Sequence, residues 1–430
     1  MELDSLIFYV VLVSDVTQIP HHTSDEVCFV RTSPKATMGY VGKLCEPLDE
    51  EKARKNYEFV RSAGVYFWLQ SSSTQLRAHQ YVQRLFDECP SAKEAVAGKL
   101  AVVTGVSPGG LGFYVAQELA LAAQMSVILA GRNAAKLQET QDAIMKEATK
   151  RGVPKTIVKL YCVPLDLDDL LSVQKAADDV KTIASQSYAN KIHVLVNNAG
   201  AVCPTYETTR QGVEANCGRN FLAPHYFTEL LMGKLKAAAT STFKPRCTFV
   251  ASLAYCTTMD MDPKALIEHP EQGGAPSGVL EFQDGECSTK SSQTFFDMYG
   301  RSKLGDVASV HYMAKKYKTV NFTSQQPGSV VSRFGSSLGW LGTVYYYGFY
   351  AFQFSPSQGA VASLRAALDP DFNTKEALQG AYLHADGNPW PKDRLKIDNP
   401  ASGQPYGWDD YSKQVFDAAN TLIAQLIKKR

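Results

Sequence analysis

A tyrosine and a lysine that could move a proton stand four positions apart near residue 300. The segment 299–303 begins with Tyr299 and ends with Lys303, a spacing that places both side chains on one face of a helix. A free tyrosine has a pKa of about 10, and an adjacent ammonium group favours the phenolate and lowers that pKa. Tyr299 is therefore a candidate general acid towards a carbonyl and a candidate general base towards an alcohol.

A glycine-rich segment could hold phosphate groups. The four glycines of residues 104–112 follow an apolar run at 100–104 and precede a helical stretch at 113–123. Glycines let the backbone turn tightly and approach a pyrophosphate, whose charge is met by the amides and dipole of the helix N-terminus. Any strand-turn-helix connection can contain glycine, so it is the position after the first predicted strand that favours a dinucleotide.

Arg132 follows the second apolar run, where an NAD-binding protein usually has an acidic residue for the ribose hydroxyls. The donors of a guanidinium match phosphate oxygens, so Arg132 suits the 2′-phosphate of NADP(H). We therefore expect NADPH or NADP+ in preference to NADH. A solvated arginine at the end of a strand is the alternative.

Short apolar runs must position these residues. The runs are rich in Val, Ile and Leu and mostly do not alternate with polar residues, as expected of strands covered on both faces. They lie at residues 100–104, 126–130, 156–163, 193–196, 247–251, 319–324 and 381–384. Because helical stretches separate them, we predict an α/β fold with a doubly wound, parallel, seven-stranded Rossmann sheet.

Residues 1–98 do not share this alternation. Residues 50–97 are predicted to be helical, with several apolar side chains near helical spacing. We therefore predict an N-terminal, mainly helical extension at residues 1–98 and a nucleotide-binding domain at residues 99–430. The extension is interpreted as a helical cap, with docking to a partner or to a membrane surface as the alternatives.

From residue 99 onward the chain resembles the short-chain dehydrogenase/reductase family, in its retinol dehydrogenase and protochlorophyllide reductase-like branch. The family's motifs occur in order: the glycine loop at 104–112, Asp166, the Asn-Asn-Ala-Gly segment at 197–200, Asn220, Ser252, Tyr299 with Lys303, and Pro327-Gly328. Ser332 stands where a threonine is commoner in the family. Together the motifs extend over most of residues 99–332.

The resemblance implies the roles of the site residues. The catalytic residues would be Asn220, Ser252, Tyr299 and Lys303. Ser252 would hydrogen-bond the substrate oxygen, Lys303 would hold the nicotinamide ribose, and Asn220 would position a water, with Asn216 as a competing structural asparagine. The cofactor would be bound by Thr104, Gly105, Ser107, Gly109, Gly110, Leu111, Gly112, Arg132, Asn133, Asp166, Asn198, Ala199, Gly200, Tyr299, Lys303, Pro327, Gly328, Val330 and Ser332.

Two departures from the family pattern stand out. The glycine loop is one residue longer than usual, which leaves open whether Gly109 or Gly110 contacts phosphate. Ser252 and Tyr299 are farther apart than in compact members, so we predict an insertion at about 256–298. It is interpreted as a substrate lid, a partner-docking loop or a solvated excursion.

Aromatic residues gather after the Pro-Gly motif. Between residues 340 and 354 they are Trp340, Tyr345, Tyr346, Tyr347, Phe349, Tyr350, Phe352 and Phe354. In the family this segment covers the substrate, so the rings favour a bulky hydrophobic molecule that resembles a retinoid, a sterol or a tetrapyrrole. Core packing or peripheral contact with a membrane surface is the alternative.

Composition restricts partners and compartment. The 430 residues carry 44 Lys and Arg against 43 Asp and Glu, which does not favour a nucleic-acid partner. Nine cysteines without a CxxC pair indicate neither a metal site nor a disulfide framework. The apolar run at 6–13 is short and follows acidic residues, so we expect no secretory signal and a reducing cytoplasmic or organellar soluble compartment.

These patterns predict an NADP-dependent oxidoreductase that interconverts a carbonyl and an alcohol on a bulky hydrophobic substrate. The alternative is a catalytically silent nucleotide-binding subunit of a larger assembly, which docks through the extension and the insertion. Oligomeric state, reaction direction and substrate identity stay open.

Overall fold

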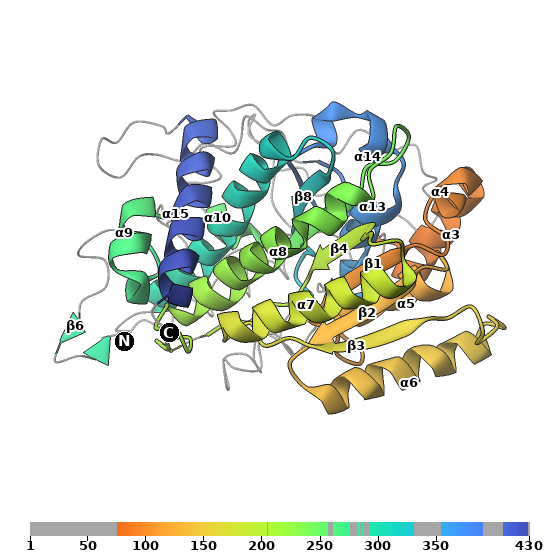
Figure 1. Cartoon of the computed structure of the whole chain (residues 1–430), viewed down its shortest axis with the longest axis horizontal. Coiled ribbons are helices and arrows are strands. Elements are labelled where there is room, and N and C mark those ends of the chain that lie inside the picture. Colours follow the sequence, from red (N-terminus) through yellow and green to blue (C-terminus); the bar gives the residue numbers. More distant parts are fainter. Residues whose placement is uncertain are drawn as a thin grey trace, which may run out of the picture. The chain divides into compact units, whose positions relative to one another are not determined.

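Seven short strands of the described chain form one parallel sheet (Figure 1). They are β1 (Leu100–Thr104), β2 (Ser126–Gly131), β3 (Leu160–Pro164), β4 (Val194–Asn197), β5 (Arg246–Val250), β8 (Asn321–Gln325) and β9 (Ala381–Leu383). Their order across the sheet is β3-β2-β1-β4-β5-β8-β9, and every neighbouring pair is parallel. The prediction of a doubly wound, seven-stranded sheet is therefore confirmed.

The structure is a computed structural model. It describes residues 75–203, 205–256, 261–275, 282–283, 286–287, 292–330, 354–389 and 407–428. The chain divides into two compact units, residues 1–56 and 57–430, and the described residues all belong to the second. Among the described helices, none has the length and apolarity needed to cross a bilayer.

Helices cover both faces of the sheet. They are α3 (Ala78–Glu88), α4 (Pro90–Glu94), α5 (Leu111–Leu121), α6 (Ala134–Lys150), α7 (Leu170–Ser187), α8 (Ala223–Ala237), α9 (Pro263–Glu268), α10 (Ser292–Lys316), α12 (Pro356–Gly359), α13 (Val361–Leu368), α14 (Asp371–Thr374) and α15 (Trp408–Lys428). Leu100 and Val102 of β1 enter a core shared with α7, α8, α10 and α15, whereas Ala101 and Val103 enter a core shared with α3, α5, α6 and α13. Both faces of β1 are buried, which explains why its sequence does not alternate.

The third strand begins later than its sequence predicts. The predicted run was 156–163, but β3 starts at Leu160. Pro154 begins a turn in which Ile157 donates to the Pro154 carbonyl at 3.1 Å, and Ile157 is 39% exposed. The prediction of a strand at 156–159 is wrong because Thr156 and Ile157 lie in a surface turn, and Val158 and Lys159 precede the first residue of β3.

Part of the N-terminal extension packs on the sheet domain. Helix α3 buries Ala78, Val82 and Phe86 at a spacing of four, in the same core as α5. The prediction of helices is confirmed for residues 78–94, while residues 1–74 lie outside the described residues. The domain boundary at Gly98 stays a prediction.

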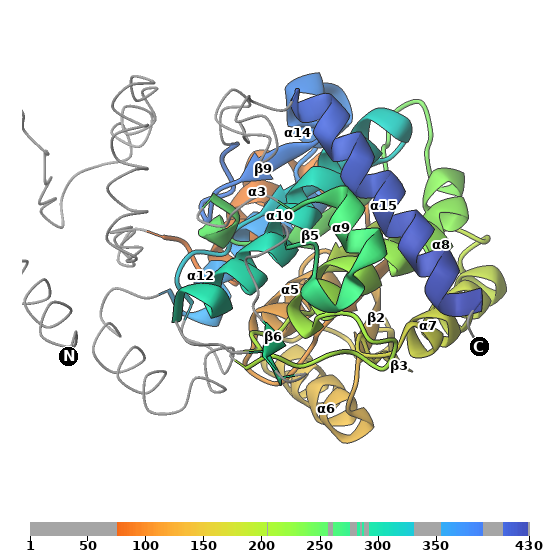
Figure 2. The same cartoon turned by 90° about the vertical axis from the view of Figure 1, so that its left-hand side faces the viewer.

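The insertion is partly built into the domain. It follows a 3-10 turn at Leu253–Cys256 and contains α9, a second 3-10 turn at Pro270–Gln272, and two short antiparallel strands, β6 (Phe282–Gln283) and β7 (Glu286–Cys287). Met261 and Leu266 are fully buried in the core that contains α15, and the Tyr411 hydroxyl donates to the Met261 carbonyl at 3.1 Å. Figure 2 shows α15 lying across α9 and α10. Residues 261–275 are therefore not a solvated excursion.

Candidate active site

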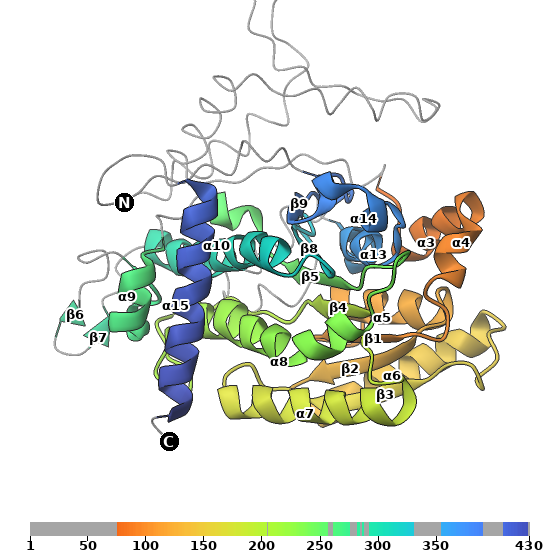
Figure 3. The ribbon, with the colours of Figure 1, turned by 45° about the horizontal axis from the view of Figure 1, so that its top comes forward.

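The predicted site residues gather at one edge of the sheet. Because the strands are parallel, the carboxyl ends of β1, β2, β3, β4, β5 and β8 all lie at this edge (Figure 3). The glycine loop, Arg132, Asp166, Asn198 and Ser252 each follow one of these strands. A crevice at the carboxyl ends of such strands is where doubly wound sheets bind ligands.

Hydrogen bonds join the ends of β1 and β4. The Thr104 hydroxyl accepts from the backbone N–H groups of Asn198 and Ala199, at 3.1 and 3.0 Å. The Asn198 side-chain amide donates to the carbonyls of Thr104 and Gly105, at 2.8 and 3.1 Å. The glycine loop and the Asn-Asn-Ala-Gly segment are thus held as one rigid unit.

The glycine loop is shaped as a cradle for a dinucleotide. Gly105 has a φ of +71°, and a Cβ there would lie 2.5 Å from the Ala199 backbone. Gly109 has a φ of +72° and nothing within 4 Å of a Cβ position, so its backbone borders open space. Gly110 is the N-cap of α5 in extended conformation, and it has no side chain to satisfy the first N–H groups of that helix. These residues fit a bound pyrophosphate.

The residues predicted to contact the adenosine half are placed at the same edge. Arg132 and Asn133 are exposed beyond β2, and the Asn133 side chain accepts from Lys136 N at 3.0 Å as the N-cap of α6. Asp166 accepts from Asp168 N at 3.2 Å, and Arg210 lies 4.0 Å away. Arg132 directly follows the last residue of β2, so its exposed guanidinium lies at the carboxyl end of that strand.

Asn220 lies in a π-helical turn, Cys217–Leu222, that leads into α8. Its side chain accepts from Ala201 N and donates to Ala201 O, both at 2.9 Å, and also donates to Ser302 Oγ at 3.2 Å. Asn216 makes the equivalent pair of bonds with the backbone of Cys203. Both asparagines therefore hold the loop after β4, and Asn220 alone also reaches α10.

The side chains of Ser252, Tyr299 and Lys303 lie next to one another. The hydroxyl groups of Ser252 and Tyr299 form a hydrogen bond, and Lys303 Nζ lies 5.9 Å from the centroid of the Tyr299 ring. Tyr299 is 8% exposed. The three side chains form a compact group at the carboxyl end of β5.

The net pKa shift of Tyr299 differs from the sequence-based expectation. Burial raises the pKa of Tyr299 above its ordinary value, although Lys303 and Ser252 act to lower it. For Lys303, burial acts to lower the pKa, but Asp306 and Tyr299 outweigh burial and raise it. The expected lowering by the ammonium exists, but it is smaller than the opposing effect of burial.

Sequence reasoning missed Asp306. Its Oδ2 lies 3.0 Å from Lys303 Nζ, and the two side chains are 2% and 4% exposed. The sequence does contain a signal for this ion pair, because a carboxylate three positions after a lysine on a helix is a common ion-pair spacing.

The Pro-Gly motif lies beyond β8. Gly328 has a φ of +79° and packs against the Phe354 ring, and Val330 forms a β-bridge with Phe354. A Cβ at Gly359 of α12 would meet both Val330 and Leu111. Ser332 and the aromatic residues at 340–350 and 352 lie outside the described residues.

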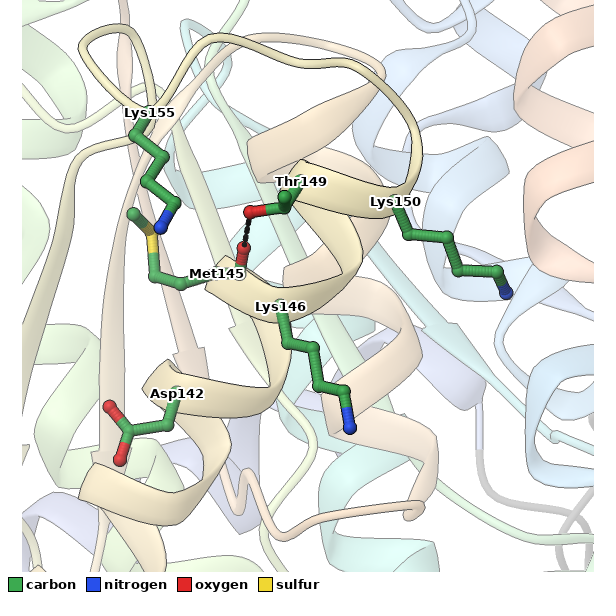
Figure 4. A pocket seen from close by; sticks show the side chains of 6 residues that line it. All are labelled: Asp142, Met145, Lys146, Thr149, Lys150 and Lys155. Carbon is green, nitrogen blue, oxygen red and sulfur yellow. Dashed lines mark hydrogen bonds between the residues drawn. The ribbon is translucent and has the colours of Figure 1, made fainter.

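A shallow hollow of about 510 Å³ lies elsewhere, on α6 (Figure 4). It is lined by Asp142, Met145, Lys146, Thr149, Lys150 and Lys155. Because these residues precede β3, the hollow lies towards the amino ends of the strands and away from Tyr299. No group of three or more His, Cys, Asp or Glu side chains in the described ranges could hold a metal ion.

Comparison with known proteins agrees with this geometry. Residues 99–254 match the family model for short chain dehydrogenases. An uncharacterized oxidoreductase of Schizosaccharomyces pombe is 33% identical over 298 residues, which are 67% of this chain and 78% of that protein. The chain belongs to the short-chain dehydrogenase/reductase family. It is therefore an oxidoreductase of a family that uses NAD(P).

Other members of the short-chain dehydrogenase/reductase family are also similar. Retinol dehydrogenase 12 of Mus musculus is 27% identical over 303 residues, which cover 70% of this chain and 82% of that protein. An NADPH-bound carbonyl reductase from chicken fatty liver aligns with a TM-score of 0.46 and 20% identity, over 69% of this chain and 99% of that chain. The first similarity agrees with the retinol dehydrogenase-like branch inferred from the motifs.

Proposed function

We propose that this chain is an NADP(H)-dependent oxidoreductase that interconverts a carbonyl and an alcohol on a bulky hydrophobic substrate. The observation that carries the proposal is the hydrogen bond between Ser252 and Tyr299 beside the Lys303 ammonium. A carbonyl reduction needs three groups from the protein: an acid, a hydrogen-bond donor to the substrate oxygen and a fixed cation.

Each side chain has a defined task in the proposed reaction. When bound, the nicotinamide supplies or accepts the hydride. Tyr299 holds its proton at neutral pH, because burial raises its pKa, and donates it from Oη to the carbonyl oxygen during reduction. Ser252 donates a hydrogen bond to the same oxygen and stabilises the negative charge that develops there. Asn220 fixes the loop after β4 against α10.

The preference for NADP(H) rests on Arg132. Its exposed guanidinium directly follows Gly131, the last residue of β2, where an NAD-binding protein usually has an acidic residue. We expect Arg132→Gln to weaken NADPH binding about tenfold or more and to leave NADH binding nearly unchanged, since one charge-assisted phosphate contact is worth about 1.5–3 kcal/mol. Lys146→Gln, which removes a cation at the far end of α6, is the control. Equal losses for both cofactors in Arg132→Gln would contradict the preference.

The bulky substrate is proposed from the aromatic residues between 340 and 354 and from the similarity to a retinol dehydrogenase. Contact with a membrane or a partner through the N-terminal extension stays a prediction from the sequence, as does the reducing compartment. Turnover of aldehydes and ketones of increasing apolar size would test the substrate class. We expect kcat/KM to rise with size.

The central test is Tyr299→Phe. We expect turnover to fall by about 10²–10⁴-fold with NADPH binding preserved, because only the proton donor is lost. Tyr312→Phe, on the same helix, is the matched control and should be active. Wild-type turnover in Tyr299→Phe would refute the mechanism, and NADPH binding without turnover of any carbonyl by the wild type would favour the silent subunit.

A further inference from the structure

A buried carboxylate lies directly behind the Tyr299–Lys303 pair. Asp306 follows Lys303 by three residues on α10, so the two side chains leave the helix on the same side. Both are almost completely buried, and their charged atoms are 3.0 Å apart. Removing two charges from water is costly, and an apolar residue of similar volume would pack without that cost. The carboxylate therefore calls for a role beyond packing.

Asp306 fixes the position of the Lys303 ammonium. An ammonium has three N–H donors. In Lys303 one donates to the Val250 carbonyl at 2.9 Å and another to Asp306 Oδ2 at 3.0 Å. Val250 ends β5, two residues before Ser252, so the ammonium is held between the sheet and α10 beside the Tyr299 ring. One donor is left for the cofactor ribose or for a water.

The charge of Asp306 acts on few neighbours. The titratable groups that face it are Lys303 and Tyr299 on α10 and the Cys217 thiol on the π-helical turn, and Glu214 and Arg301 act in turn on Cys217. Asp306 Oδ1 has no hydrogen-bond partner among the described residues. Burial raises the pKa of Asp306 to about 6, with Lys303 opposing the shift, so the carboxylate is ionised at neutral pH. Its charge reaches Tyr299 with little screening.

We propose that Asp306 is a positioning residue of the active site, which holds the Lys303 ammonium in place and sets the pH at which Tyr299 releases its proton. This inference rests on the proposed role of Tyr299 as the proton donor. Lys303 stabilises the phenolate, whereas the carboxylate behind it offsets part of that effect. Burial raises the pKa of Tyr299, and the charge of Asp306 acts in the same direction, so Tyr299 keeps its proton at neutral pH, as carbonyl reduction requires.

The test is a titration of the Tyr299 phenol that needs neither substrate nor cofactor. In the full-length chain, the absorbance of the phenolate at about 295 nm is measured after rapid pH jumps, before the protein unfolds in alkali. The signal of Tyr299 is the difference between each protein and its Tyr299→Phe counterpart. We expect Asp306→Asn to lower the midpoint by about one pH unit, a tenfold change in the phenolate fraction at a fixed pH. The sign follows because a negative charge near the phenol raises its pKa.

Two further variants complete the experiment. Asp306→Glu retains the charge and is expected to titrate close to the wild type. Asp417→Asn removes a carboxylate from an exposed ion pair with Lys413 on α15 and should leave the midpoint unchanged. If Asp306→Asn does not fold, as judged by circular dichroism, Asp306→Ser replaces it as the charge-removing variant.

The outcomes separate this inference from the proposed function. A midpoint in the charge-removing variant equal to that of the wild type would overturn the role of Asp306, whatever the activity. A lowered midpoint in a protein that reduces no carbonyl would support the role of Asp306 and refute the proposed function. In an active enzyme, the same shift should appear in the pH profile of kcat for alcohol oxidation.

Discussion

The surroundings of Tyr299 favour its protonated form. Burial raises the pKa of this phenol above its ordinary value of 10.0, and the opposing effects of Lys303 and Ser252 do not reverse the shift. Below that pKa the free enzyme holds the proton needed for reduction and lacks the phenolate needed for oxidation. We therefore predict that kcat/KM for carbonyl reduction is flat across neutral pH, whereas kcat/KM for alcohol oxidation rises up to at least pH 10. Initial rates in both directions test this, and an oxidation profile that is flat from pH 6 upward would contradict it.

Two glycines of the cofactor loop share a left-handed backbone but differ in the space around them. Gly105 and Gly109 have φ values of +71° and +72°, but a Cβ at Gly105 would lie 2.5 Å from Ala199 and a Cβ at Gly109 would meet nothing within 4 Å. A left-handed alanine costs about 1–2 kcal/mol, and a backbone clash adds about 1–3 kcal/mol. We predict that Gly105→Ala lowers the free energy of unfolding by about 3–4 kcal/mol and Gly109→Ala by about 1–2 kcal/mol in urea titrations.

The same pair distinguishes stability from binding. Because Gly109 borders open space at the start of α5, we expect Gly109→Ala to weaken NADPH binding more than its small loss of stability suggests. Isothermal titration at a temperature where the variant is fully folded measures this. Unchanged affinity in Gly109→Ala would place the phosphate contact at Gly110, the other glycine that the longer loop offers.

Helices α8, α10 and α15 meet at a buried histidine. His225 Nδ1 lies 3.1 Å from Ser309 Oγ, and Nε2 lies 3.3 Å from Asn420 Oδ1. Burial lowers the pKa of His225 to about 4, and the hydrogen bond with Asn420 opposes the shift. The fold therefore holds this imidazole neutral, whereas the unfolded chain binds a proton below its ordinary pKa of 6.5.

Acid should loosen this junction. Below pH 6.5 the unfolded state binds a proton at His225 that the folded state does not bind. The contribution of His225 to the free energy of unfolding is therefore complete above about pH 6.5 and is lost as the pH falls towards 4, by about 3 kcal/mol in all. We predict that His225→Gln loses less free energy of unfolding than the wild type between pH 7 and pH 4.5. His193 has its pKa lowered by burial to about 4 and contributes in the same direction in both proteins. His269→Gln, at an exposed position, is the control, and parallel pH profiles for all three proteins would contradict the prediction.

At the scale of the whole molecule, the sheet could be predicted from sequence because most of its strands, among them β1, β2, β4 and β8, are buried on both faces by local helices. The run at 100–104 coincides with β1, since every residue in it is apolar or buried. The contacts that could not be predicted either join distant segments or depend on burial. Tyr411 meets Met261 across 150 positions, and Asp306 acts on Tyr299 only because both are buried. Burial is a property of the assembled fold, so the sign of the Tyr299 shift was beyond the reach of spacing alone.

Residues 75–97 of the extension join the same assembly through a cluster of polar side chains around the buried carboxylate of Glu118. Arg151 donates to both carboxylate oxygens of Glu118 at 2.9 Å, and His79 of α3 lies 3.1 Å from Glu118. The Glu118 side chain is 1% exposed. Helix α3 also donates through Ala78 N to Ser357 of α12 at 3.2 Å. Residues 75–97 thus contact α5, which follows the cofactor loop, and α12, whose last residue, Gly359, lies against Leu111 at the start of α5.

These contacts predict where the folding unit begins. A chain that starts at Gln75 keeps α3 and α4, whereas one that starts at Lys99 leaves the apolar surface of α5 uncovered and removes Val82 and Phe86 from the core. Each such side chain contributes about 1.5–3 kcal/mol by burial. We expect the chain that starts at Lys99 to have a urea midpoint lower by about 1 M or more and to bind NADPH more weakly. Arg84→Ala, on the exposed side of α3, is the control. Its free energy of unfolding should match that of the full chain within about 0.5 kcal/mol. Equal midpoints for the two starts would instead place the boundary at Gly98, because a helix that adds no stability to the sheet is not part of its folding unit.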